Sequence, residues 1–311
     1  MNLQQLEYIV SVDTHRHFVK ASETCFVTQA TLSMMIKKLE EELDIVIFDR
    51  SKQPVVPTEL GAKIISQAKV VLMETKRVNE IISNERGEIA GDLRLGVIPT
   101  VAPYLLPFFL NRFLLKYPKV SIKINEFTTE QLIEKLINQE IDVAILATPL
   151  NNTQLLETPI YYEKFIAYTP GQAKYKNKKY LLPKDIDVNK LWLLEEGHCL
   201  RSQIVNLCEL RKKTKEHSNL QYEAGSIETL IRMTESNNGI TILPEMVLGN
   251  LTKEQLKNIY PFKAPEPARE VSIVTYRHFL KGAIINSLKS EILSSIPKEM
   301  LNVKKKEKIE I

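Results

Sequence analysis

The chain has 311 residues, of which 44% are hydrophobic and 26% are charged. Its length exceeds that of one typical domain, and its composition is that of a folded globular protein rather than a disordered one. Met1–Val10 lacks the basic start and the apolar core of a secretory signal, and no run of about 18 apolar residues predicts a membrane span. We therefore expect two or three domains in the cytoplasm, without a membrane partner.

Charge does not by itself indicate the partner. The net charge is +4, and residues 1–58 hold six Lys or Arg against eight Asp or Glu. A nucleic-acid interface must therefore be recognised from where the charges lie rather than from their sum. The three cysteines are too few for a disulfide framework in a cytosolic chain, so they are either buried thiols or residues with redox or metal chemistry.

Residues 1–58 show the pattern of three short helices followed by a β-hairpin. Leu3, Leu6 and Val10 form an apolar stripe, a second helix runs over 18–25, and a third over about 28–43. The third helix repeats apolar residues on one face, namely Leu32, Ile36, Leu39 and Leu43. Two helices joined by a tight turn are typical of a helix-turn-helix, and the hairpin would be its wing.

The start of the third helix carries the small and polar residues that suit a DNA groove. Thr28 and Ser33 favour phosphate contacts, and the amide of Gln29 can pair with adenine. Lys37 and Arg50, the latter on the hairpin with Lys52, would neutralise phosphates. An ordinary polar surface helix is an equal alternative on spacing alone. The residues that we expect to contact double-stranded DNA are Thr28, Gln29, Thr31, Ser33, Lys37 and Arg50.

Residues 59–90 predict one long linker helix. Its apolar residues recur at spacings of three, four and seven, and are Leu60, Ile64, Val71, Leu72, Val78 and Ile82. So narrow a stripe on so long a helix favours a dimer seam over packing against its own domain.

From residue 92 the pattern changes to alternating strands and helices, which predicts an α/β domain. We expect strands at 93–98, 120–127, 143–147, 165–169, 192–194, 220–223, 240–243 and 271–276, and helices through residue 113, over 130–138, and after residues 200, 226 and 281. The lysine-rich segment 298–311 is expected to be a disordered tail.

The stretch from Glu195 to Arg201 concentrates reactive chemistry. Cys199 is flanked by His198 and Arg201, and a helix starting at Cys199 would add its N-terminal dipole, so its thiol pKa is expected to be lowered. Cys208 follows nine residues later. One unbroken helix would separate the two cysteines by about 13 Å along its axis, whereas a disulfide needs Cα atoms about 5.5–6 Å apart. Joining them requires the segment to refold.

Other interpretations of the cysteines stay open at this point. They can be inert buried thiols, which is also what the apolar neighbours of Cys25 indicate. A metal site would draw on Cys199, Cys208, His198 and His217, but lacks closely paired ligands. A thiol enzyme would need a Cys-x-x-Cys pair or a recognisable nucleophile context, and neither occurs.

Thr100 and Thr129 each follow an expected strand and open an expected helix. Ligands of open α/β sheets bind at this edge, where helix N-termini offer N–H donors. A capping box formed by Thr128 and Gln131 explains the second position equally well.

The N-terminal residues match a known pattern, formed by Phe18, Ala21, Thr28, Gln29, Leu32, Ser33, Lys38, Leu39, Glu40, Leu43, Phe48, Arg50, Thr58 and Gly61. Further matching stretches are 6–8, 15–18, 98–101, 103–107, 197–201, 239–244 and 266–269. Together they resemble the LysR-type transcriptional regulators from residue 1 to about residue 297. The stretch Gly197–Arg201 with Cys208 is similar to the peroxide-sensing branch of that family.

This resemblance implies a winged helix-turn-helix over 1–58, a linker or dimerisation helix over 59–90, and a redox-sensing regulatory domain over 91–297. The regulatory domain would be periplasmic-binding-protein-like, with lobe I at 92–164 and 269–297 and lobe II at 165–268. Cys199 would be the peroxidatic cysteine and Cys208 the resolving one, with Arg201 in support. The peroxide pocket would comprise Thr100, Thr129, His198 and Arg269.

The implied signal is hydrogen peroxide, with oxidation reorienting dimers within a tetramer on DNA. A thiol-reducing system would reset the switch, and RNA polymerase is a further expected partner. We expect no cofactor, no bound metal and no enzymatic activity. Ala30, in place of the usual proline, and the pair Met34–Met35 depart from the family and leave base preference open. The alternatives are a LysR-type regulator that senses a metabolite between its lobes, and a thiol peroxidase.

Overall fold

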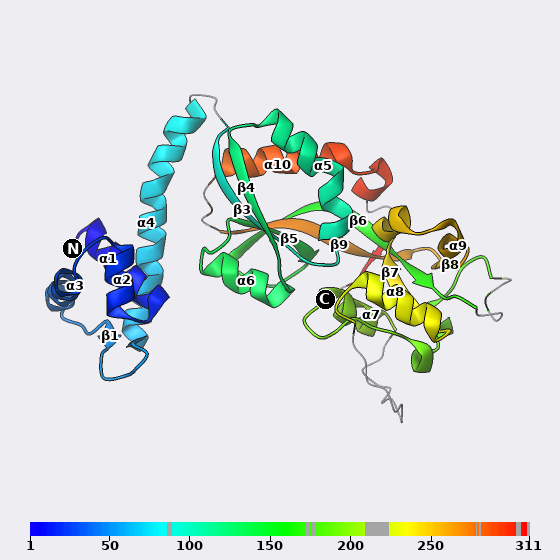
Figure 1. Cartoon of the computed structure of the whole chain (residues 1–311), viewed down its shortest axis with the longest axis horizontal. Coiled ribbons are helices and arrows are strands. Elements are labelled where there is room, and N and C mark those ends of the chain that lie inside the picture. Colours follow the sequence, from blue (N-terminus) through cyan, green and yellow to red (C-terminus); the bar gives the residue numbers. More distant parts are fainter. Residues whose placement is uncertain are drawn as a thin grey trace. The chain divides into compact units, whose positions relative to one another are not determined.

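The computed structural model describes residues 1–85, 89–171, 175, 178–208, 224–277, 279, 281–302 and 306–309. The chain divides into two compact units, Met1–Glu88 and Ile89–Ile311, and each is described by itself (Figure 1).

The first unit is a winged helix-turn-helix followed by a long helix. Its elements are α1 (Leu3–His15), α2 (Phe18–Thr24), α3 (Gln29–Leu43), β1 (Phe48–Asp49), β2 (Val56–Pro57) and α4 (Glu59–Glu85). The predicted apolar face of α3 is buried at Leu32, Ile36 and Leu39, each 0% exposed. Leu43 does not join this face and is 36% exposed, because α3 ends there and the left-handed Asp44 turns the chain away.

The long helix α4 divides its apolar residues between two faces. Ile65 and Ala68 pack into the helix-turn-helix core at 2% exposure each. Leu60, Val71 and Val78 are exposed to 49%, 37% and 56%, whereas the side chain of the predicted seam residue 82 lies outside the described part. Of the predicted stripe, Ile64 and Leu72 pack partly buried against this core, whereas Leu60, Val71 and Val78 stay exposed. Neither α4 nor any other described helix is apolar enough to cross a membrane.

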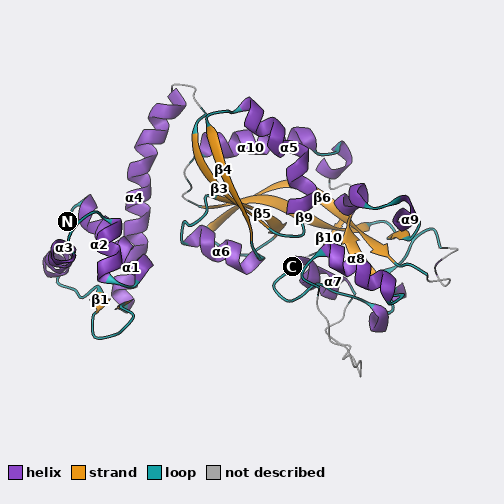
Figure 2. Ribbon diagram, viewed as in Figure 1, coloured by secondary structure: helices purple, strands orange, loops and turns teal. Residues whose placement is uncertain are grey.

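The second unit is a curled mixed sheet of order β4-β3-β5-β9-β6-β7 covered by helices (Figure 2). Strands β3 (Gly91–Val97), β4 (Val120–Glu126) and β5 (Val143–Thr148) are parallel. Helices α5 (Ala102–Lys116), α6 (Thr129–Ile137) and α10 (Gly282–Ser295) cover this lobe. Two long antiparallel strands, β6 (Leu155–Tyr168) and β9 (Glu266–Tyr276), continue towards the second lobe. The predicted fold class is confirmed.

The second lobe contains β7 (Thr241–Pro244), β8 (Ile259–Pro261), α7 (Cys199–Leu207), α8 (Ile227–Ser236) and α9 (Lys253–Leu256). Short 3-10 helices are η2 (Pro183–Asp185), η3 (Val188–Lys190), η5 (Glu245–Asn250) and η6 (Lys298–Leu301). The strand expected at 165–169 is the end of β6, which begins at Leu155. The strand expected at 192–194 is wrong, since only isolated bridges form at Leu191 and Leu194. Residues 220–223 lie outside the described part.

The C-terminal segment is not the disordered tail that its lysines predicted. Met300 in η6 is 7% exposed, and β10 (Lys306–Lys308) pairs in parallel with β9. Ile309 packs against the main hydrophobic core. The prediction is therefore wrong for the described residues of 298–311, because two apolar residues among the lysines find sites on the second unit.

Candidate functional site

Four elements bring Cys199 together with three of the predicted pocket residues, Thr100, Thr129 and Arg269, at the junction of the lobes. Thr100 follows β3, Thr129 is the first residue of α6, Cys199 is the first residue of α7, and Arg269 lies on β9. Gly197 precedes the start of α7 with a φ of +90°, and a β-carbon there would lie 3.5 Å from the methyl group of Thr128. The N-termini of α6 and α7 therefore approach each other closely.

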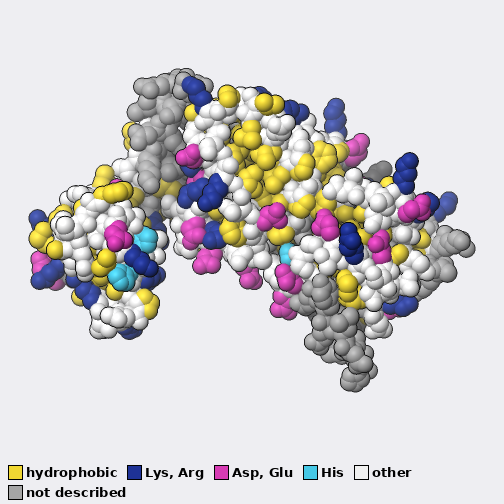
Figure 3. All heavy atoms as spheres, in the orientation of Figure 1, with side chains coloured by type: hydrophobic (Ala, Val, Ile, Leu, Met, Phe, Trp, Pro, Cys, Tyr) yellow, Lys and Arg dark blue, Asp and Glu magenta, His cyan; other side chains and the backbone are white. Residues whose placement is uncertain are grey.

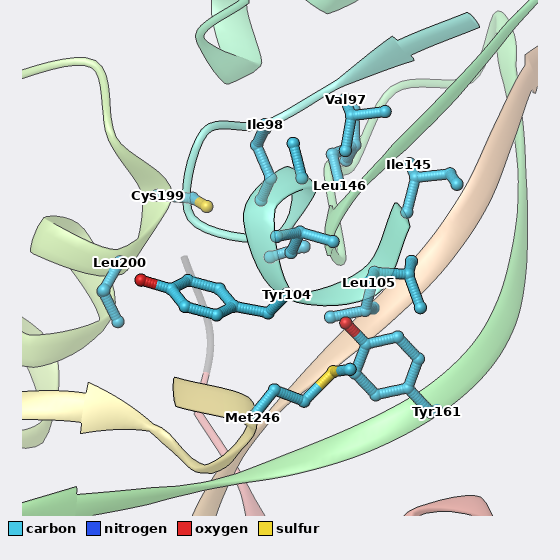
Figure 4. Packing of buried hydrophobic residues seen from close by; sticks show 14 of the residues in the cluster. Val97, Ile98, Tyr104, Leu105, Ile145, Leu146, Tyr161, Cys199, Leu200 and Met246 are labelled. Carbon is cyan, nitrogen blue, oxygen red and sulfur yellow. The ribbon is translucent and has the colours of Figure 1, made fainter. Parts of the chain in front are cut away.

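Cys199 is buried at 4% exposure, in the main apolar core. Figure 4 shows its sulfur at the edge of this cluster, beside the chain at Ile98 and near Leu200, towards which the Tyr104 ring points. Burial raises the pKa of the Cys199 thiol above its ordinary value, while the charge of Arg269 and the Thr129 hydroxyl oppose this rise. The expected lowering is therefore wrong for this conformation, because desolvation outweighs the nearby charge.

The start of α7 at Cys199 is confirmed, and backbone hydrogen bonds at Leu200 and Ala147 act on the thiol to lower its pKa. These contacts leave a neutral thiol that is already surrounded by the groups that would stabilise a thiolate.

Arg269 carries the positive charge next to this thiol and is itself 1% exposed. Its Nη1 donates to Thr100 Oγ1 at 2.9 Å, and its Nη2 donates to the Thr100 carbonyl at 3.0 Å. Its Nε donates to Glu163 Oε2 at 2.8 Å. The register of β6 on β9 places Glu163 directly opposite Arg269. Three hydrogen bonds, two to Thr100 and one to Glu163, therefore hold the guanidinium in place without a ligand.

The Thr129 hydroxyl acts on the Cys199 thiol, whose pKa it lowers, but it is not otherwise engaged within the described part of the chain. The capping box of α6 is formed by Thr128 and Gln131, so capping does not engage Thr129. At 8% exposure, its Oγ1 makes no hydrogen bond of normal geometry within the described part of the chain. A buried hydroxyl in this state is an available donor and acceptor for a small polar ligand beside Cys199.

His198 and Arg201 hold the start of α7 in different ways. The His198 ring is buried at 5% exposure, and its Nε2 lies 3.6 Å from Glu195 Oε1. Arg201 donates through Nη1 to the Leu194 carbonyl at 2.7 Å. The positive charge expected from Arg201 is thus directed at the preceding loop, and Arg269 is the cation that acts on Cys199.

Cys208 ends the same helix that Cys199 begins. It is the C-cap residue of α7 and is 8% exposed, and neither cysteine is in a disulfide. The unbroken helix separates the two residues by about 13 Å along its axis, which is too far for a disulfide. A bond between them requires α7 to unwind.

A metal site receives no support from the described residues, where no three His, Cys, Asp or Glu side chains are grouped. His217, one of its possible ligands, lies outside the described part. Cys25 packs partly buried against the helix-turn-helix core.

The exposed side of α3 holds the residues expected to contact DNA. Thr28 caps the helix by accepting from the Thr31 amide at 3.1 Å. Gln29 and Ala30 are exposed beside it, and Lys37 has a 70% exposed side chain that lies 3.6 Å from Glu41. The helix therefore presents a small N-terminal end and exposed lysines, of which Lys37 is paired with Glu41.

Arg50 and Ser33 lie together rather than apart. Arg50 donates to Glu40 Oε2 at 2.9 Å and to Ser33 Oγ at 3.2 Å, and its guanidinium lies 5.2 Å from the centre of the Phe18 ring. Glu40 also accepts from the backbone of Ile47. Arg50 therefore fastens the wing to α3, and Glu40 offsets its charge.

Sequence reasoning missed Glu163 and the contact between Tyr104 and Glu228. Tyr104 donates to Glu228 Oε1 at 2.8 Å, and burial together with this carboxylate raises the pKa of Tyr104. A signal for Glu163 existed, since Arg269 lies in an apolar strand and a buried arginine requires a carboxylate partner.

Comparison with known proteins assigns the chain to a family. Residues 86–292 match the LysR substrate binding domain, and residues 3–62 match the bacterial regulatory helix-turn-helix protein, lysR family. The chain belongs to the LysR family. This is a family of transcription regulators and not of enzymes, which confirms that part of the prediction.

The family members that it resembles include named peroxide regulators. It is 37% identical over 275 residues to the "Hydrogen peroxide-inducible genes activator" of Haemophilus influenzae, covering 88% of this chain and 90% of that protein. It is 34% identical to the "DNA-binding transcriptional dual regulator OxyR" of Escherichia coli, covering 88% and 89%. Full-length OxyR C199D from Pseudomonas aeruginosa superposes with a TM-score of 0.75 at 32% identity, covering 95% and 99%.

Proposed function

We propose that this LysR-family protein is a DNA-binding transcription regulator that responds to hydrogen peroxide through a reversible disulfide between Cys199 and Cys208. The observation that carries the proposal is the position of Cys199, beside Arg269 and the Thr129 hydroxyl, at one end of a helix that Cys208 ends. The names of its relatives support the same signal.

The first chemical step is oxidation of Cys199. The sulfur attacks one peroxide oxygen, the O–O bond breaks, and the other oxygen leaves as water after taking up the thiol proton. The product is a sulfenic acid. Arg269 and Thr129 stabilise the charge that develops on the leaving oxygen, with Thr100 and His198 completing the pocket.

The second step joins the two cysteines. The Cys208 sulfur attacks the sulfenic sulfur of Cys199, forms the S–S bond and releases a second water molecule. Because α7 holds the residues about 13 Å apart, the bond forms only after the helix unwinds. A thiol-reducing system returns both sulfurs to thiols. Oxidation therefore exchanges one packed conformation of this lobe for another.

Transmission to DNA requires self-association. The exposed side of α4 offers Leu60, Val71 and Val78 as a seam between helices. On the second unit, Figure 3 shows hydrophobic side chains gathered over the region of α5 and α10, where Phe108 and Leu115 are 53% and 77% exposed. We propose that these two surfaces make the dimers and tetramers that place the helix-turn-helix units on double-stranded DNA.

DNA binding measured with and without peroxide tests the proposal. Peroxide should change the footprint of the wild-type protein on its operator, and Cys199→Ser and Cys208→Ser should remove this response. Cys25→Ser is the matched control and should respond as the wild type does. A Cys199→Ser protein that still responds to peroxide would overturn the proposal and favour a sensor of another small molecule.

A further inference from the structure

The C-terminal strand β10 occupies an edge of β9 that no other described strand covers. Strand β5 pairs with residues 270–274 of β9, and β6 pairs along the opposite edge. Strand β10 pairs with residues 266–268. Ala268 is the partner of both Lys164 in β6 and Lys308 in β10, so β10 lies on the β5 side and extends the sheet where β5 has ended.

The same segment is bonded to the helix that carries the cysteines. The Ile309 amide donates to the Ala268 carbonyl at 2.9 Å, and the Ile309 carbonyl accepts from Gln203 Nε2 at 3.1 Å. Gln203 lies in the middle of α7 and is 0% exposed. One residue of the C-terminal segment therefore connects α7 to β9, next to Arg269.

A buried carboxylate fixes the segment from the other side. Lys308 Nζ lies 2.9 Å from Glu270 Oε1, and the Thr148 hydroxyl donates to the same oxygen at 2.7 Å. Burial raises the pKa of Glu270, but Lys308 and Thr148 outweigh it, so that the pKa lies below its ordinary value. The carboxylate stays charged and holds Lys308 in place.

We propose that residues 306–309 form a strap that holds α7 in its helical dithiol conformation and must release it before Cys199 and Cys208 can join. This inference rests on the proposed function. Unwinding α7 moves Gln203 away from the half-buried Ile309 and breaks the hydrogen bond that the buried Gln203 amide donates to its carbonyl. The strap therefore favours the dithiol over the disulfide and raises the peroxide dose at which the switch responds.

The test compares the thiol–disulfide equilibrium of the full chain with that of two variants. One ends at Asn302 and lacks the strap, and the other is Lys308→Ala. In glutathione buffers of defined ratio, the truncated protein should favour the Cys199–Cys208 disulfide by about tenfold more than the wild type, the factor for roughly one net hydrogen bond. Lys308→Ala should shift the equilibrium in the same direction by a smaller factor.

Lys116→Ala is the matched control. Lys116 lies 3.3 Å from the buried Glu291, so this pair resembles the pair of Lys308 and Glu270. Glu291, however, is on α10 and not in the segment that contacts α7. It should leave the equilibrium unchanged, which separates a strap from a general loss of stability.

Amide exchange at Ile309 gives a second measurement, and it needs no variant. It should be slow in the dithiol protein and fast in the disulfide protein. Unchanged equilibria in both variants, or equal exchange in the two redox states, would overturn the strap while leaving the disulfide itself intact. A wild-type protein that forms no disulfide would overturn the proposed function as well.

Discussion

Arg269 and Glu163 form an ion pair in which each side chain is only 1% exposed, with Nε 2.8 Å from Oε2. The pair weakens the electrostatic effect of Arg269 on Cys199, because the negative charge of Glu163 offsets part of the field of the guanidinium. Burial remains the main reason that the Cys199 thiol stays protonated, and the pair adds to it by weakening the opposing effect of the Arg269 charge.

Glu163→Gln should lower the pKa of Cys199. The amide oxygen can still accept from Arg269, but the negative charge is gone, so the thiolate is favoured more strongly. Thiolate absorbance followed through a pH titration gives the value, with Cys199→Ser as the blank. A purely structural role for Glu163 predicts lower stability with no fall in the thiol pKa.

Arg269→Gln should destabilise the protein by about 3–5 kcal/mol, because it leaves Glu163 buried without its partner. Denaturant unfolding measures the change. The double variant with Glu163→Gln should recover most of the loss. If the single and double variants are equally unstable, the charge of Glu163 is not the cause.

The dithiol protein should lose stability as the pH rises above the ordinary cysteine value of about 8.5. Since the folded-state pKa of Cys199 is raised, the unfolded chain releases this proton first, and the unfolding free energy falls until the folded pKa is passed. Below the unfolded value the contribution is fully present. Cys199→Ala should flatten this slope, and an unchanged slope would contradict the raised pKa.

Lys37→Ala should weaken DNA binding on all sequences and reduce the slope of log K against log salt by about one, as loss of one phosphate contact does. Arg50→Ala should change the salt slope less than Lys37→Ala does, because the Arg50 charge is already offset by Glu40. Its main effect should be to loosen the contact between the wing and α3. The exposed Lys257 of the second unit provides the control substitution. Equal salt slopes for wild type and Lys37→Ala would place Lys37 away from the phosphates.

Val78→Glu should weaken self-association by placing a charge in the exposed α4 seam. Sedimentation of the protein over a range of concentrations measures the effect. Ser66→Glu introduces the same charge on the same helix away from the seam and should leave assembly intact. A dimer that is equally stable in both variants would exclude this surface.

Local pattern was enough to predict the helix from Cys199 and the buried face of α3, because both follow from neighbours in the chain. The partner of Arg269 was not predictable in this way, since Glu163 meets it only through the register of β6 on β9. The pKa of Cys199 depends on burial by several distant elements. The C-terminal strap was not predictable, because a lysine-rich end is typical of a solvated segment and the contact of Lys308 with Glu270 arises only in the folded sheet.

Peptide mapping of the protein before and after a short, stoichiometric pulse of hydrogen peroxide tests the redox mechanism most directly. We expect a new covalently linked pair of peptides that contains Cys199 and Cys208, and that disappears on reduction. Finding Cys199 oxidised with Cys208 still a thiol, or both unmodified, would contradict the switch.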